Sequence, residues 1–77
     1  MRITDLEPGT VYVATSPFRD DGGTLVLEGD RMTVERVDPV AFEGAFRVTF
    51  REETLVLHED RQSDVVEHAE RFLRPAK

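Results

Sequence analysis

The sequence predicts a mainly β fold: a small, SH3-like, five-stranded antiparallel barrel with one C-terminal α-helix. Three observations favour this class. Short apolar runs alternate with polar residues, turns rich in Gly and Asp separate the runs, and the apolar period changes from two to about 3.6 after Glu59. The rival architecture is α+β, an antiparallel sheet covered by a helix. Either fold hosts many functions, so function must be argued from individual residues.

Length and composition restrict the chain to one small domain over residues 1–77. A chain of this size hides only about 60% of the surface that its unfolded form exposes, which leaves little room for a deep active site. The absence of cysteine excludes disulfides and thiolate chemistry. No apolar run approaches the roughly 18 residues of a membrane span, and no signal-type segment follows Met1, so we expect a soluble, cytoplasmic protein.

Residues 10–16 form the first predicted strand. The preceding Pro8-Gly9 pair is typical of a tight turn, and Pro17 ends the strand. The residues that follow contain an Asp-Gly turn signal and are expected to form a long loop. We expect Phe18, at the start of this loop, to fold back toward the core.

Residues 24–28 and 31–37 form the second and third predicted strands, joined by an acid-Gly turn at Gly29. The alternation of apolar and polar residues slips at Arg36-Val37. This slip predicts either a bulge or the end of the strand.

Residues 45–51 and 54–59 form the fourth and fifth predicted strands, joined by a polar hairpin tip. Phe46, Val48 and Phe50 alternate with polar residues, which is typical of a half-buried antiparallel strand. The same alternation predicts that Leu55 and Leu57 of the fifth strand point inward.

Residues 61–74 form the predicted helix, because five apolar residues recur at helical spacing and share one face. Asp60 or Ser63 can cap its start, and Pro75 marks its end. Its acidic residues are expected to pair with arginines four positions further on. The apolar residues are Val65, Val66, Ala69, Phe72 and Leu73.

Residues 6–14 read Leu-Glu-Pro-Gly-Thr-Val-Tyr-Val-Ala. This segment resembles the opening of a small bacterial family of unknown function whose members begin Leu-x-Pro-Gly-x-x-Tyr-x-Val, with Ala14 in place of Val. The next loop resembles the family's Phe-x-Asp-x-Asp-Gly with one residue missing, residues 29–33 resemble its Gly-Glu-x-Trp-Thr, and the segment at Gly44 resembles its Asp-Gly-Leu. The resemblance supports the strand order and implies no catalytic residue. Met32 stands where the family favours Trp, which puts in doubt any aromatic site at that position.

The charge distribution argues against a nucleic-acid partner. Sixteen acidic and ten basic residues give a formal net charge of -6, and the arginines lie within a few residues of acidic ones. A protein that binds nucleic acid needs a segregated basic surface, which this pattern does not provide. The acidic excess indicates either a basic protein partner or solubility alone.

The sequence contains no recognisable catalytic set, so we expect that the protein is not an enzyme and has no cofactor. The Asp20-Asp21 and Glu52-Glu53 pairs fall at predicted loop tips, where exposed carboxyl groups are poorly suited to acid–base catalysis. There is no nucleophile elbow around a serine and no phosphate-binding loop. The two histidines are predicted at the surface and not at a metal site.

The candidate partner-binding residues are of two kinds. Aromatic side chains can line a groove for an extended peptide, the alternative being that they fill the core. Acidic turns can meet a basic patch on another protein. The candidates are Tyr12, Phe18, Phe42, Asp20, Asp21, Glu52 and Glu53.

These observations predict a non-catalytic small protein-interaction module with a protein partner and no membrane role. One alternative is an acidic inhibitor or immunity-type protein that masks a basic partner, and another is a nucleic-acid-associated small barrel. Salt dependence separates them, because charge masking weakens steeply with salt and recognition of an apolar peptide does not. Whether an exposed strand edge pairs two copies into a homodimer stays open.

Overall fold

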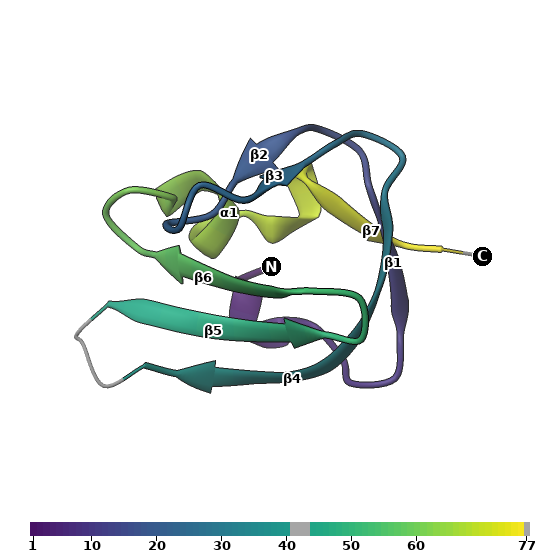
Figure 1. The fold of residues 1–77 in the computed structure, drawn as a ribbon, viewed down its shortest axis with the longest axis horizontal. Helices are drawn as coiled ribbons and strands as arrows, with labels where there is room; N and C mark the ends of the chain where they lie inside the picture. The colour runs from purple at the N-terminus through teal and green to yellow at the C-terminus, as the bar shows by residue number, and fades with distance from the viewer. Residues whose placement is uncertain (41–43, 77) are drawn as a thin grey trace.

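The structure is a computed structural model that describes residues 1–40 and 44–76. They form a five-stranded antiparallel sheet in the order β6-β5-β4-β1-β7, a separate two-stranded sheet of β2 and β3, and short helices (Figure 1). The mainly β class is confirmed. In chain order the elements are η1 (Ile3–Asp5), β1 (Val11–Ala14), β2 (Phe18–Arg19), β3 (Leu25–Val26), β4 (Arg31–Pro39), β5 (Ala45–Phe50), β6 (Thr54–His58), α1 (Ser63–Glu67), η2 (Ala69–Arg71) and β7 (Leu73–Pro75).

The strand pairs within the described residues do not close into a barrel. β6 and β7 are the two edges of the large sheet, and β2 pairs only with β3. Three elements were not predicted from the sequence: η1, β2 and β7. The fold at this level is a five-stranded sheet with a two-stranded sheet and a short helix beside it.

A tight turn leads into β1, as the Pro8-Gly9 pair predicts. The Thr10 amide donates a hydrogen bond to the Glu7 carbonyl across the turn, with N and O 3.2 Å apart. Gly9 has a φ of 84°, a conformation that L side chains rarely adopt without strain.

The longest strand, β4, lies in the middle of the large sheet, between β5 and β1. Its first residues pair with β1 and its last residues with β5, and the register shifts between Val34 and Arg36. An extra residue at such a bulge lets a strand bend from one partner to the next. The register shift confirms the predicted bulge, although it lies just before Arg36-Val37. The strand then continues to Pro39, beyond its predicted end at residue 37.

The hairpin of β5 and β6 supplies much of the core. It closes where the Phe50 amide donates to the Glu53 carbonyl, with N and O 2.8 Å apart. Leu55 and Leu57 are buried, as the alternation predicts, and so is Phe50. Phe46, predicted on the same buried face, is only half-buried.

The predicted helix over residues 61–74 is wrong in extent. The α-helix ends at Glu67, and the backbone of His68 (φ -132°, ψ 56°) leaves the helical region. A 3₁₀ turn follows, and then β7 pairs antiparallel with β1, with Arg74 opposite Val13. The chain leaves the helix because extended pairing satisfies the edge N–H and C=O groups of β1, which a continued helix would leave open.

The apolar residues expected on one helical face are nevertheless inward. Val65, Val66, Ala69 and Leu73 are buried and Phe72 packs against the core. Local periodicity thus identified which of these side chains are buried, but not the backbone conformation of the segment, which is helical only as far as Glu67.

The ends of the short helix are also held differently from the prediction. Gln62 is the N-cap residue and provides no side-chain cap; its Oε1 instead accepts from the His58 amide at 2.8 Å. Glu67 pairs with Arg2, and Glu70 accepts from the Met1 ammonium group at 2.9 Å, which holds the pKa of Glu70 below its usual value. The acidic residues therefore connect the helix to the first residues of the chain and not to the arginines that follow them.

The core joins both sheets to η1, α1 and η2, and α1 packs against both η1 and β6. No helix in the described part of the chain has the length and apolar character needed to cross a membrane. The largest fully buried side chains are Ile3, Val26, Val34, Val48, Leu55, Leu57, Val66 and Leu73.

Candidate functional site

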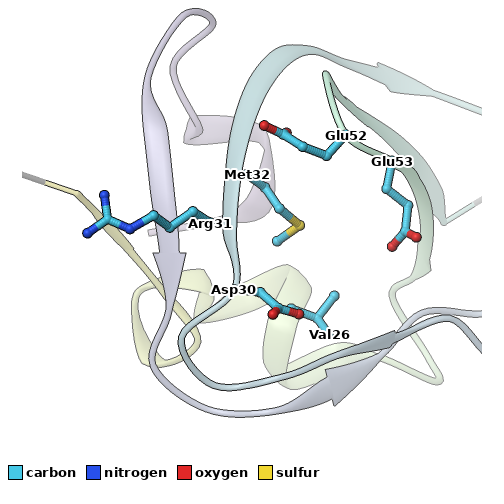
Figure 2. A pocket seen from close by; sticks show the side chains of 6 residues that line it. All are labelled: Val26, Asp30, Arg31, Met32, Glu52 and Glu53. Carbon is cyan, nitrogen blue, oxygen red and sulfur yellow. The ribbon is translucent and has the colours of Figure 1, made fainter.

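A hollow of about 210 Å³ opens between the turn that leads into β4 and the tip of the β5–β6 hairpin. We call it the acidic hollow, because carboxylates outnumber the other polar groups that line it. Figure 2 shows Met32 in the middle of these side chains, Val26 beside Asp30, and the Arg31 guanidinium pointing away from the others. The lining residues are Val26, Asp30, Arg31, Met32, Glu52 and Glu53.

Asp30 is positioned by the turn between β3 and β4. The Asp30 amide donates to the Leu27 carbonyl at 3.0 Å, and the Asp30 carboxylate accepts from the Leu27 amide at 2.9 Å. Gly29 permits this turn because its φ is 94°. The carboxylate therefore has a fixed place at the rim of the acidic hollow.

Glu52 is positioned by the hairpin tip and by β4. Its Oε1 accepts a hydrogen bond from the Thr33 amide at 2.8 Å, and the Arg51 amide donates to the Thr33 carbonyl. The side chain of Glu52 thus supplies an acceptor at the end of the β4–β5 pairing, near the bulge. The hydrogen bond from the Thr33 amide holds the pKa of Glu52 below its usual value, because it stabilises the ionised form.

The acidic hollow combines an apolar floor with a negative rim. Val26 and Met32 form this floor and are only 1% and 5% exposed, so the floor is well packed and only a small part of it is open to solvent. The carboxylates of Asp30, Glu52 and Glu53 surround this surface (Figure 2). Such a site fits a cationic group carried on an apolar stem. No cluster of three His, Cys, Asp or Glu side chains suited to a metal ion occurs in residues 1–40 and 44–76.

Among the predicted site residues that the structure describes, two meet in this hollow, Glu52 and Glu53. Tyr12, predicted near a surface groove, is 3% exposed and lies in the core, where its hydroxyl accepts from the Glu7 amide at 3.1 Å. Phe42 lies outside the residues that the structure describes.

The expectation that Asp20 and Asp21 form an exposed loop tip is wrong for Asp20. Asp20 is only 6% exposed, and its two carboxylate oxygens accept from the amides of Thr24 and Val56. Burial is tolerated because both oxygens have donors. Asp21 forms an ion pair with Arg61 at the surface.

Phe18 folds inward, as predicted, and its ring stacks edge-to-face with that of Phe72 at a centroid distance of 5.6 Å. These two rings line a second hollow of about 420 Å³ beside the start of α1. No sequence pattern indicates this pair, because the two rings lie on segments far apart in the chain. The predicted groove of three aromatic residues is therefore not assembled from Tyr12 and Phe18.

The sequence pattern did not indicate that Val26, Met32 and Asp30 belong to the acidic hollow. Met32 and Val26 read as ordinary core residues, and Asp30 as one of several acidic turn residues. Nothing local indicates that the Asp30 turn and the tip at Glu52 and Glu53 lie together. Only the pairing of β4 with β5 brings them into one site.

Comparisons with known proteins identify the fold and not the role. No protein-family model matches the chain, and no curated protein matches it. The structure is similar to that of an integron cassette protein from the mobile metagenome of Vibrio cholerae, with a TM-score of 0.84 and 19% sequence identity over 92% of this chain and 88% of that one. At this identity the similarity concerns the fold alone.

Proposed function

We propose that the protein is a non-catalytic interaction module that binds a basic segment of a protein partner at the acidic hollow. The observation that carries the proposal is the arrangement of Asp30, Glu52 and Glu53 around an apolar floor. The bend in β4, which joins the two halves of the large sheet, supports an SH3-like arrangement of the strands. The predicted resemblance to a bacterial family of unknown function is compatible with this role and adds no residue to it.

A lysine or arginine side chain matches the hollow in both of its parts. Its charged end can meet the carboxylates, while its methylene stem can cover the small part of Val26 and Met32 that is exposed. The formal net charge of -6 favours encounter with a basic partner, because complementary charge raises association rates.

The size and the electrostatics of the hollow support binding without catalysis. A volume of about 210 Å³ accommodates a side chain and is below the range of roughly 300–1,000 Å³ typical of small-molecule sites. The lowered pKa of Glu52 keeps this carboxyl ionised, whereas a general acid needs a raised pKa.

The proposal is tested by fluorescence anisotropy with a labelled peptide of alternating Arg and Gly and a matched Glu–Gly peptide. Only the basic peptide should bind, and its affinity should fall steeply between low and high salt. Glu53→Gln should weaken binding by up to about fivefold, because an exposed ion pair contributes on the order of 0.2–1 kcal/mol.

Glu35→Gln is the matched control. Glu35 is exposed on β4 and lies outside the hollow, and its substitution changes the net charge by the same amount. Equal losses in the two variants would show that net charge, and not the acidic hollow, attracts the peptide. Failure of the wild-type protein to bind the basic peptide would refute the proposed function.

A further inference from the structure

The two-stranded hairpin of β2 and β3 is joined to the large sheet at few points. Within the described part of the chain, one main-chain hydrogen bond connects residues 18–27 with the large sheet, from the Asp21 amide to the Val56 carbonyl at 2.7 Å. A two-stranded hairpin is marginally stable by itself. Its position therefore depends on side-chain contacts.

One carboxylate connects this hairpin to the edge of the large sheet. Oδ1 of Asp20 accepts from the Thr24 amide at 2.7 Å, inside the hairpin, and Oδ2 accepts from the Val56 amide at 3.0 Å, on β6. Hydrogen bonds to an ionised, buried acceptor are stronger than those between neutral groups. Together with the Asp21 amide, the Asp20 carboxylate occupies both main-chain groups of Val56.

The hairpin also forms a wall of two hollows. Val26 of β3 lines the acidic hollow, and Phe18 and Arg19 of β2 line the second hollow, whose opposite wall includes Ser63 and Val65 of α1. Any displacement of the hairpin changes the shape of both. Figure 1 shows the turn between β2 and β3 close to β6 and α1.

We propose that the β2–β3 hairpin is a flap whose closed position is fixed by Asp20, and that this position controls the acidic hollow. Asp20 is a positioning residue: it does not line the hollow but holds the strand that supplies Val26. The control of ligand binding rests on the proposed function, whereas the flap itself does not. Opening of a segment with few backbone links is expected to cost less than global unfolding.

Hydrogen exchange of the full chain, followed by NMR without any ligand, tests the flap in Asp20→Ala and in the milder Asp20→Asn, which keeps one acceptor oxygen. The informative amides are those of Asp20 and Asp21, because their acceptors are the Thr24 and Val56 carbonyls and not the mutated side chain. We expect their exchange to accelerate about tenfold or more in Asp20→Ala and less in Asp20→Asn.

The reference amides are those of Val34 and Val66, which donate to Thr10 and Gln62 outside the hairpin. Their exchange should stay unchanged. Unchanged exchange at Asp21, or equal acceleration at Val34 and Val66, would overturn the flap, because the hairpin would then not move as a separate unit. Asp21→Asn is the matched control: it removes the pair with Arg61 but keeps the Asp20 carboxylate.

Peptide binding then separates the flap from the proposed function. If the basic peptide binds the wild type, Asp20→Asn should weaken it more than Asp21→Asn, although both remove one negative charge. Equal binding by these variants would overturn control by the flap while leaving the proposed function intact. Absence of binding to the wild type would refute the proposed function and with it the control of a basic ligand, while the exchange data would still decide whether the flap exists.

Discussion

The large sheet and the β2–β3 hairpin are stabilised in different ways. The sheet has long strand pairs and a continuous apolar face, with Val48, Leu55 and Leu57 at most 1% exposed. The hairpin has strands of two residues, and Leu25 on it is 43% exposed. Apolar burial thus holds the sheet, whereas the hairpin has only Phe18 and Val26 in the core and adds a buried carboxylate that links it to β6.

The two edges of the large sheet are blocked in different ways. On the β6 edge, Asp20 and Asp21 occupy the amide and carbonyl of Val56. On the β7 edge, Pro75 has no amide hydrogen to offer to another strand. Both devices reduce pairing with a second chain. A homodimer formed by strand pairing stays a prediction, and these edges disfavour it.

The largest expected effect is in the core of the sheet. Phe50→Ala should lower the free energy of unfolding by about 3–5 kcal/mol, because truncation of a buried Phe loses apolar contacts and leaves a cavity. Phe50 is 3% exposed, and a loss of this size is comparable to the whole stability expected of so small a domain.

Phe46→Ala is the comparison variant, since Phe46 lies on the same strand but is half-buried. Urea denaturation followed by circular dichroism should show a smaller loss for Phe46→Ala than for Phe50→Ala. Equal losses would contradict the burial of the two rings.

A smaller effect is expected from a polar contact between β1 of the sheet and the turn that precedes it. Tyr12→Phe removes the acceptor of the Glu7 amide and should cost about 0.5–1.5 kcal/mol in urea denaturation. In contrast to Asp20→Ala, it should leave the exchange of the Asp21 amide unchanged relative to the Val34 amide. Selective acceleration at Asp21 would show that the sheet and the hairpin are not independent.

The smallest effect concerns pH. The pKa of Glu52 is below its usual value of 4.5 in the folded state, mainly because the Thr33 amide donates to it. Its stabilising contribution is therefore complete above pH 4.5 and is lost as the pH falls through the folded pKa. The difference in Tm between the wild type and Glu52→Gln should shrink between pH 7 and pH 3, as measured by thermal denaturation. A constant difference would mean that the Thr33 contact does not depend on the charge of Glu52.

The prediction from sequence succeeded where the pattern is local. Alternation located the inward leucines of β6, and the Pro8-Gly9 pair located the turn before β1. It failed for Asp20, since an Asp-Asp-Gly-Gly run reads as an exposed turn whatever the chain does elsewhere. The donor that makes burial possible is the amide of Val56, 36 positions away.

The candidate site was only half predicted for the same reason. The acidic character of Glu52 and Glu53 is evident in the sequence, and their exposure follows from their place in a hairpin tip. That Asp30 faces them across Val26 and Met32 depends on the pairing of β4 with β5 and on the position of the β2–β3 hairpin.

The sequence by itself determined most of the buried apolar residues of β5, β6 and the segment after Glu59 and where most strands and turns lie, because these follow from the spacing of apolar side chains and from the conformations of Gly and Pro. The tertiary structure alone decided that residues 73–75 form a strand, that Asp20 is buried and that three carboxylates share a hollow. The first two depend on backbone groups at a strand edge that need a partner, and the third depends on the pairing of β4 with β5; in each case the partner becomes available only when distant segments meet.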